Sequence, residues 1–234
     1  VARKGRAGAD MLASIVIPVH NNVEMTEACL DSIETYTPEA HEVVVVDNGS
    51  NDGTRESLSR RKNVRLVCNP ENLGFARAVN IGIRTSSGGY VVVLNNDVLV
   101  TPRWLSNLLY CAESSPDVGA VGPVTANCSG CQRVPVGFAN VEEMVRFAEG
   151  WNRPDPGKWF ETDRLVAFCL LVKRGVFDRV GLFDERFGQG NFEDDDFCLR
   201  VRAAGYRLLV AGDTYVHHVG SATFARSKVD YGML

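Results

Sequence analysis

Tyr90-Val-Val-Val-Leu-Asn-Asn-Asp97 is the stretch of sequence that decides the fold. Its apolar residues, three of them β-branched, predict a short buried strand that runs straight into two amides and a carboxylate. In an open α/β sheet the ligand crevice lies at the carboxyl ends of the strands, so we expect Asp97 at the mouth of such a crevice. The alternative is that Asn95-Asn96-Asp97 forms only a polar turn, with Asp97 helping to start the next helix.

Strands and helices alternate on both sides of this stretch, which predicts a mostly parallel sheet with right-handed crossovers. Before it we expect strands at Ser14–Val19, Glu42–Asp47 and Val64–Cys68, and helices at Val23–Thr35, Thr54–Arg61 and Gly74–Thr85. After it we expect a helix at Pro102–Ser114, strands at Val118–Thr125, Leu165–Val172 and Tyr206–Val210, and a helix at Val141–Glu149 within the irregular stretch Cys128–Lys158.

The size and composition fit one large globular α/β domain, since the chain has 234 residues, of which 45% are apolar and 23% charged. The net charge of −4 argues against nucleic acid as a partner, because a protein that binds the phosphate backbone carries a basic excess. No apolar run approaches the roughly 20 residues that span a bilayer, so we predict no transmembrane segment. We expect a cytoplasmic protein, with the inner face of the membrane as a second possible location.

The ends of the chain predict a domain cut from a longer protein, because the chain begins at a valine and opens with a basic, Gly- and Ala-rich segment. We assign residues 1–13 to a linker or disordered segment, 14–222 to the domain, and 223–234 to a tail that leads into a further domain. The seven cysteines are scattered and read as reduced core residues. Cys128 and Cys131 form a single CxxC without a second pair, so we do not favour zinc or redox chemistry there.

Polar residues follow three of the expected strands at the point where each ends. They are His20 and Asn21, Asp47 and Asn48, and Asn95 to Asp97. The loops at such strand ends converge in space, so these residues should line one pocket. The first strand is not followed by GxGxxG, and GxxxxGK[ST] occurs nowhere, which argues against a dinucleotide cofactor and a P-loop.

Two further segments carry residues that predict a functional carboxylate and a metal ligand. Phe192-Glu-Asp-Asp-Asp-Phe-Cys-Leu-Arg-Val-Arg202 is a helix that begins with four acidic residues. An acidic side chain at a helix N-terminus contributes about 0.3–1 kcal/mol, but four in a row repel one another and indicate a site that uses a carboxylate. His217 and His218 are adjacent at a strand end, so at most one of them faces a given side, and that one is a candidate metal ligand.

Six segments together resemble the inverting glycosyltransferases of family 2, which have the GT-A fold. They are Ser14-Ile-Val-Ile-Pro-Val-His-Asn21, Val44-Val-Val-Asp-Asn-Gly-Ser-Asn-Asp-Gly-Thr54, Asn69-Pro-Glu-Asn-Leu-Gly-Phe-Ala-Arg-Ala-Val-Asn80, Leu94-Asn-Asn-Asp97, Phe192-Glu-Asp-Asp-Asp-Phe-Cys-Leu-Arg200 and His217-His-Val-Gly-Ser221. The resemblance implies a Rossmann-like α/β fold with helices flanking a mostly parallel central sheet. It also implies transfer of a sugar from a UDP-, GDP- or dTDP-sugar to a hydroxyl of a glycan or other acceptor, as in bacterial-type glycan or glycoconjugate synthesis.

The resemblance also assigns roles to residues. Donor-binding positions fall on Pro18, His20, Asn21, Asp47, Asn48, Asn72, Gly74, Phe75, Asn95 and Asn96. Asp97 and His218 would hold Mn²⁺ or Mg²⁺, with His218 preferred to His217 because Val219-Gly220-Ser221 follows it. The general base falls on Asp194. Asn95 departs from the family's DxD motif, in which the first residue is Asp.

The chemistry of the residues agrees with these roles. A diphosphate leaving group gains negative charge that a divalent cation stabilises, and an attacking hydroxyl needs a base on the opposite face. One alternative is a sugar nucleotidyltransferase, but it needs a Gly-rich loop with Lys or Arg after the first strand, where His20-Asn21-Asn22-Val23 stands. The other is a catalytically impaired domain that binds carbohydrate or a partner, which the Asn95 departure leaves open.

Overall fold

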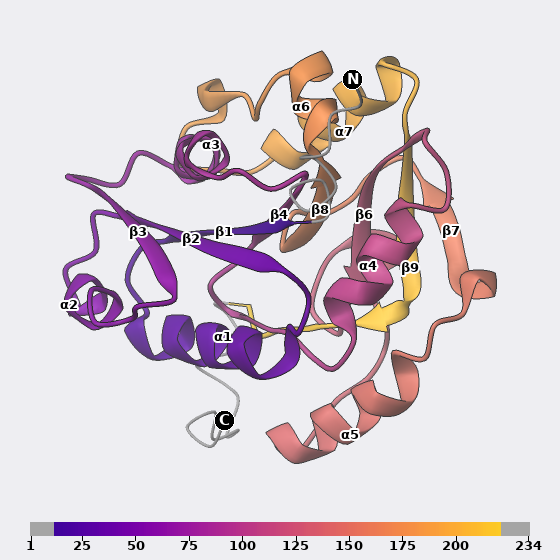
Figure 1. Ribbon diagram of the computed structural model, residues 1–234, viewed down its shortest axis with the longest axis horizontal. Helices are drawn as coiled ribbons and strands as arrows, with labels where there is room; N and C mark the ends of the chain where they lie inside the picture. The colour runs from indigo at the N-terminus through magenta and orange to yellow at the C-terminus, as the bar shows by residue number, and fades with distance from the viewer. Residues whose placement is uncertain (1–11, 221–234) are drawn as a thin grey trace, which may run out of the picture.

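The computed structural model describes residues 12–220. The expected tail at 223–234, Ser221 and nearly all of the expected linker at 1–13 lie outside the described residues. Within residues 12–220 the chain builds an eight-stranded sheet with the strand order β3-β2-β1-β4-β8-β6-β9-β7 (Figure 1). The strands are β1 (Ala13–Val19), β2 (His41–Asn48), β3 (Val64–Asn69), β4 (Tyr90–Leu94), β6 (Val118–Val124), β7 (Trp159–Thr162), β8 (Cys169–Lys173) and β9 (Arg207–Tyr215).

The sheet is mostly parallel, as predicted. β1 pairs in parallel with both β2 and β4, β2 with β3, and β6 with β9, whereas β8 and β7 run antiparallel to their neighbours. The central strands are continuous runs of Val, Ile and Leu because helices cover both faces of the sheet. All five residues of β4 are buried. The carboxyl ends of β1, β2 and β4 therefore open at one edge of a rigid core.

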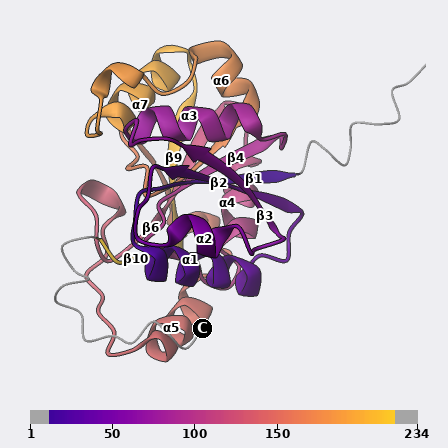
Figure 2. The same ribbon diagram turned by 90° about the vertical axis from the view of Figure 1, so that its left-hand side faces the viewer.

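Helices pack on both faces of the sheet (Figures 1 and 2). One face is covered by α1 (Val23–Tyr36), α2 (Thr54–Leu58) and α4 (Trp104–Ala112). The other is covered by α3 (Phe75–Thr85), α6 (Arg174–Val180) and α7 (Glu193–Ala203). The remaining helical elements are α5 (Val141–Trp151) and the 3₁₀ turns η1 (Gly130–Gln132), η2 (Pro156–Lys158) and η3 (Glu185–Phe187).

The expected strand Leu165–Val172 is wrong in its first half. Residues 165–168 are irregular, and β8 begins at Cys169. The backbone N–H groups of Val166 and Ala167 donate to the side chains of Gln132 and Asp194 instead of to a neighbouring strand. The segment is buried and apolar without being a strand, because side chains satisfy its backbone.

A two-stranded antiparallel sheet joins β5 (Val98–Leu99) to β10 (His217–His218). In its register His218 lies opposite Val98, and the N–H of Val219 donates to the carbonyl of Asp97 at 2.9 Å. This pairing brings the end of the described chain against the carboxyl end of β4. None of the helices within residues 12–220 combines the length and the apolar composition that crossing a membrane requires.

Candidate active site

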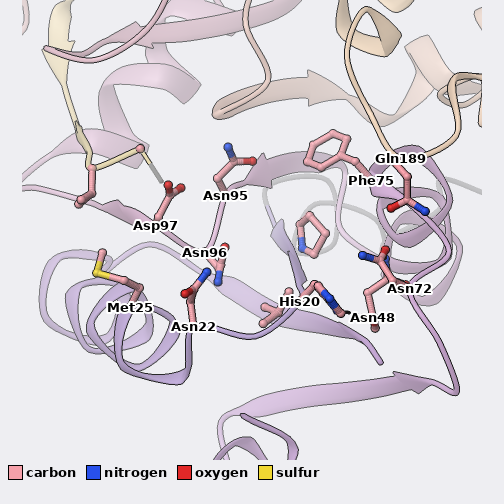
Figure 3. Close-up of a pocket in the computed structure, with 14 residues that line it drawn as sticks. His20, Asn22, Met25, Asn48, Asn72, Phe75, Asn95, Asn96, Asp97 and Gln189 are labelled. Atoms are coloured by element: carbon pink, nitrogen blue, oxygen red, sulfur yellow. Dashed lines mark hydrogen bonds between the residues drawn. The ribbon is translucent and has the colours of Figure 1, made fainter. Parts of the chain in front are cut away.

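A cavity of about 340 Å³ lies at the carboxyl ends of β1, β2 and β4, and we call it the strand-end cavity (Figure 3). It is lined by Pro18, Val19, His20, Asn22, Met25, Asn48, Asn72, Phe75, Asn95, Asn96, Asp97, Gln189, Val219 and Gly220. Residues from all three polar strand ends meet here, as the sequence predicts. Asp97 lies at one end of the cavity, and Asn48, Asn72 and Gln189 lie at the other (Figure 3).

An amide network fixes the second strand end. Asn48 Nδ2 donates to Asn72 Oδ1 at 2.7 Å, and the same oxygen accepts the N–H of Gly74 at 3.0 Å. His20 Nδ1 lies 3.0 Å from the carbonyl of Asn48, and because a carbonyl only accepts, Nδ1 is the donor. These bonds hold amide and imidazole groups in place before any ligand arrives.

Asp47, Asn21 and Gly74 do not line the cavity, although the resemblance assigns them to donor binding. Asp47 is fully buried, and its carboxylate accepts from the N–H of Ser50 and from Arg55 Nε, both at 3.0 Å. Asn21 lies in the left-handed region, and its Oδ1 accepts from the N–H of Asn51. Direct contact of Asp47 with a nucleotide is therefore not the geometry seen here, because its carboxylate is fully buried beneath the loop after β2 and lies outside the cavity wall.

Gly74 contributes to the site because its backbone packs closely against the backbone of Gly188. Its φ is +86°, and a Cβ at this position would lie 1.9 Å from the carbonyl oxygen of Gly188. The absence of a side chain lets the loop at residues 188–190 pack against the start of α3. This contact places Gln189 in the cavity wall.

Asp97 and His218 face each other, with Asp97 Oδ1 3.3 Å from His218 Nε2. His218 Nδ1 donates to the carbonyl of Asn127 at 2.7 Å, and the ring stacks on Phe168. Burial lowers the pKa of His218, but the hydrogen bond and charge of Asp97 outweigh it and hold the pKa above its ordinary value. In the neutral imidazole a nitrogen lone pair points at a carboxylate, which is the arrangement that a proton or a cation between them would stabilise.

His217 points elsewhere. Its Nδ1 lies 3.0 Å from the hydroxyl of Tyr215, and its ring packs against Phe138. Burial, together with the neighbouring His218, lowers the pKa of His217 to about 4. Of the two adjacent histidines, His218 is the one that faces Asp97.

The charge of the strand-end cavity bears on whether a metal fits. Among the described residues that line it there is one carboxylate and neither Lys nor Arg. Residues 12–220 contain no cluster of three or more His, Cys, Asp or Glu side chains arranged to hold a metal. Asp97 and His218 could supply two ligands of types that Mn²⁺ accepts, so a cation would complete its coordination with oxygens of a ligand in the cavity.

A second cavity of about 460 Å³ adjoins the first and shares Phe75, Asn95 and Gln189 with it. We call it the α7 cavity, because the start of α7 forms one wall. Its other lining residues are Ser129, Arg164, Val166, Ala167, Phe168, Gly190, Asn191, Phe192, Glu193 and Asp194. The shared wall means that groups bound in the two cavities could touch.

Asp194 is almost fully buried in this second cavity and is held by two backbone donors. Its Oδ2 accepts from the N–H of Ala167 at 3.2 Å and its Oδ1 from the N–H of Asp195 at 3.0 Å. Neighbouring Glu193 is also buried, and its Oε2 has no hydrogen-bond partner among the described residues. Burial raises the pKa of Glu193, and the charges of Asp194 and Asp195 add to that effect.

Among the lining residues that were not predicted from the sequence are Asn22, Met25, Gln189, Arg164 and Phe192. Gln189 had a readable signal, since Gly188 and Gly190 flank it and allow the chain to turn sharply before the acidic helix. Arg164, whose guanidinium forms an ion pair with Asp195, had no such signal, because it is a single basic residue directly before the expected strand Leu165–Val172.

Comparison with known proteins shows the family. Residues 14–180 match the model described as "Glycosyl transferase family 2". The chain is 30% identical over 229 residues to the N-acetylglucosaminyl-diphospho-decaprenol L-rhamnosyltransferase of Mycobacterium tuberculosis, covering 84% of this chain and 73% of that protein. It is 37% identical over 214 residues to glycosyltransferase AglE of Haloferax volcanii, covering 88% of this chain and 66% of that protein.

The fold is also that of solved glycosyltransferase structures. The chain superimposes with a TM-score of 0.68 on the mannosyltransferase PcManGT from Pyrobaculum calidifontis, solved in complex with GDP-Man and Mn²⁺. The identity is 24%, with 89% of this chain and 57% of that chain covered. The chain spans only 25% of another relative, a protein of Sinorhizobium fredii. The predicted family and fold are confirmed: the chain belongs to glycosyl transferase family 2 and has the GT-A fold.

Proposed function

We propose that this domain is a metal-dependent, inverting glycosyltransferase that takes a nucleotide-diphosphate sugar as donor and a hydroxyl group as acceptor. The observation that carries the proposal is the pair of adjoining cavities. One holds Asp97 facing His218, the other holds a fixed buried carboxylate, and Asn95 lies in the wall between them. This arrangement suits inverting glycosyl transfer, in which donor and acceptor must meet with the base on the acceptor side.

In the donor half, the amides of Asn48, Asn72 and Asn96 and the ring of His20 bind and orient the nucleotide and the sugar. Asp47 contributes by ordering the loop after β2. A divalent cation, Mn²⁺ or Mg²⁺, would bind to Asp97 and His218 and neutralise the charge that the diphosphate gains as it leaves. The need for it is physical, since none of the described residues lining this cavity is a Lys or Arg.

In the acceptor half, Asp194 accepts the proton of the attacking hydroxyl. Its two backbone donors fix the carboxylate while each oxygen keeps a further lone pair for the incoming O–H. Attack from this cavity on a sugar held in the strand-end cavity comes from the side opposite the diphosphate, which inverts the anomeric carbon. Relatives support the reaction class, since both named relatives are glycosyltransferases and the mannosyltransferase structure contains GDP-Man and Mn²⁺.

The experiment is a panel of UDP-, GDP- and dTDP-sugars incubated with the protein in Mn²⁺, in Mg²⁺ and in EDTA. We expect hydrolysis of one nucleotide series, dependent on the cation, and an inverted anomer in the initial product by NMR. Nucleotide binding without turnover of any donor, with or without added glycan acceptors, would instead indicate a binding module. In that case Asn95, which replaces the first Asp of the DxD motif, would account for the loss of catalysis. Turnover unaffected by EDTA would remove the cation from the proposal.

A further inference from the structure

We propose that Phe192 is the platform on which the acceptor binds, its exposed ring stacking against the apolar face of a pyranose. The acceptor hydroxyl would then belong to a saccharide unit. This inference rests on the proposed function, because it deepens the role of the α7 cavity.

The backbone at Phe192 is unusual. Its φ is 72° and its ψ is −3°, and the two residues before it, Gly190 and Asn191, also have positive φ, at 135° and 80°. Positive φ is a genuine outlier for a bulky side chain, and such strain clusters at ligand-binding sites. Three successive residues with positive φ turn the chain so that the Phe192 ring faces outward.

Local structure gives no reason for phenylalanine at this position. Phe192 is the N-cap of α7 and provides no side-chain hydrogen bond to the first turn of the helix. Asn or Asp would tolerate the left-handed backbone better than Phe does. Packing gives no reason either, because Phe192 is 67% exposed, the largest value among the exposed large apolar residues in the described part of the chain.

The position of the ring supplies a reason. Phe192 lines the α7 cavity two residues before Asp194, and Ser129 and Asn191 offer hydroxyl and amide groups in the same cavity. An aromatic face beside a few polar groups suits a pyranose, whose C–H bonds on one side meet the negative face of the ring while its hydroxyls reach the polar groups. A sugar seated there would present a hydroxyl to Asp194.

Charge argues against an anionic group at this place. Among the described residues that line the α7 cavity, Arg164 is the one cation, and its guanidinium forms an ion pair with Asp195. Glu193 and Asp194 contribute two carboxyl groups to the same wall. An anionic group next to Phe192 would be repelled, whereas a neutral sugar ring would not.

A matched set of variants tests the proposal. Phe192→Asn removes the ring and suits the left-handed backbone, so we expect it to fold with an unchanged or higher melting temperature. Phe192→Tyr keeps the aromatic face. Leu199→Ala is the control, since Leu199 is 61% exposed, lies two turns along the same helix and does not line the cavity.

The probes are the methyl pyranosides of glucose, galactose, mannose, rhamnose and N-acetylglucosamine, observed by saturation-transfer NMR in the presence of UDP, GDP or dTDP with Mn²⁺. We expect wild type to saturate the C–H protons on one face of at least one pyranoside. Affinity for that pyranoside should fall about three- to tenfold in Phe192→Asn, the size expected for a lost aromatic contact. It should return in Phe192→Tyr and stay at the wild-type value in Leu199→Ala.

Several outcomes would overturn the proposal. One is that the wild-type protein binds none of the pyranosides. A second is that folded Phe192→Asn keeps the wild-type affinity. A third is that Phe192→Asn loses binding to phosphatidylcholine–phosphatidylglycerol vesicles while keeping pyranoside binding, which would assign the ring to a membrane surface. Failure of the proposed function is distinguishable, because it would appear as absent nucleotide-sugar turnover while pyranoside binding still depends on Phe192.

Discussion

The two cavities are built from different kinds of structure. The strand-end cavity stands on the ends of three parallel strands, and hydrogen bonds between amides lock its walls. The α7 cavity stands on a loop with successive positive φ values and on the first turn of one helix. The rigid side suits a ligand part common to many donors, and the irregular side is where a domain of this fold can vary its acceptor.

The largest expected effect is a loss of turnover without a loss of nucleotide affinity, and it comes from a substitution in the α7 cavity. Asp194→Asn keeps the shape of the side chain but removes its ability to accept a proton, so turnover should fall by about 10²–10⁴-fold. Nucleotide affinity should persist, since Asp194 does not line the strand-end cavity. The amide variants Asp195→Asn and Asp196→Asn are controls expected to cost much less.

Glu193→Gln sharpens this prediction, because Glu193 is the second buried carboxyl group in the same cavity. We expect it to keep more activity than Asp194→Asn. If folded Asp194→Asn turned over the donor normally while Glu193→Gln was inactive, the base would have to be reassigned to Glu193. Circular dichroism of each variant checks that the fold is retained.

The next effect belongs to the strand-end cavity. His218→Ala should weaken Mn²⁺-dependent turnover by at least about tenfold, in line with roughly 1.5–3 kcal/mol for a bond to a charged group. His217→Ala should cost far less metal affinity, because the His217 ring faces Tyr215 and Phe138. Titrating Mn²⁺ against turnover gives both values, and the reverse ranking would move the ligand to His217.

Gly74 packs against the loop that carries Gln189, which lines both cavities, so its substitution should disturb both. In Gly53→Ala only the left-handed backbone is strained, at about 1–2 kcal/mol, since nothing lies within 4 Å of the new Cβ. Gly74→Ala adds the clash with Gly188 and should cost about 1–3 kcal/mol more. Urea unfolding of the two variants measures the difference, and equal losses would show that the loop gives way freely.

The smallest predicted change concerns Asp47. Asp47→Ala should weaken nucleotide binding by about 1–3 kcal/mol, because the carboxylate that orders the loop after β2 is lost. Asp47→Asn keeps an oxygen for the N–H of Ser50 and should lose less. Calorimetry with a nucleoside diphosphate measures both, and unchanged affinity in both variants would remove Asp47 from donor binding by either route.

Much of the fold could be predicted because its central strands are runs of buried apolar residues that end in polar turns. The expected strand at Ser14–Val19 corresponds to β1 (Ala13–Val19), and the expected helix at Val23–Thr35 corresponds to α1. The edge strand β7 (Trp159–Thr162) was missed because it is short, with half-buried residues at its two ends and exposed residues between them, which gives no clear period. The antiparallel direction of β8 could not be read either, since a buried strand has the same pattern in both directions.

The site divides in the same way. His20, Asn48 and Asp97 lie where strand ends place them, so their convergence follows from the sheet alone. The burial of Asp47 depends on Arg55, eight residues later, whose guanidinium reaches back to its carboxylate. The exposed ring of Phe192 depends on a backbone conformation that three residues adopt together, and no single residue type predicts that conformation.

In the proposed function, the strand-end cavity binds a nucleoside diphosphate only together with a divalent cation. Calorimetry of UDP, GDP and dTDP with the wild-type protein, first in EDTA and then in Mn²⁺, tests it most directly. We predict that one of the three binds in Mn²⁺, that binding falls below detection in EDTA, and that His218→Ala weakens the Mn²⁺-dependent binding. Equal affinity in EDTA and in Mn²⁺ would contradict the claim, because the cavity would then hold the diphosphate without the cation.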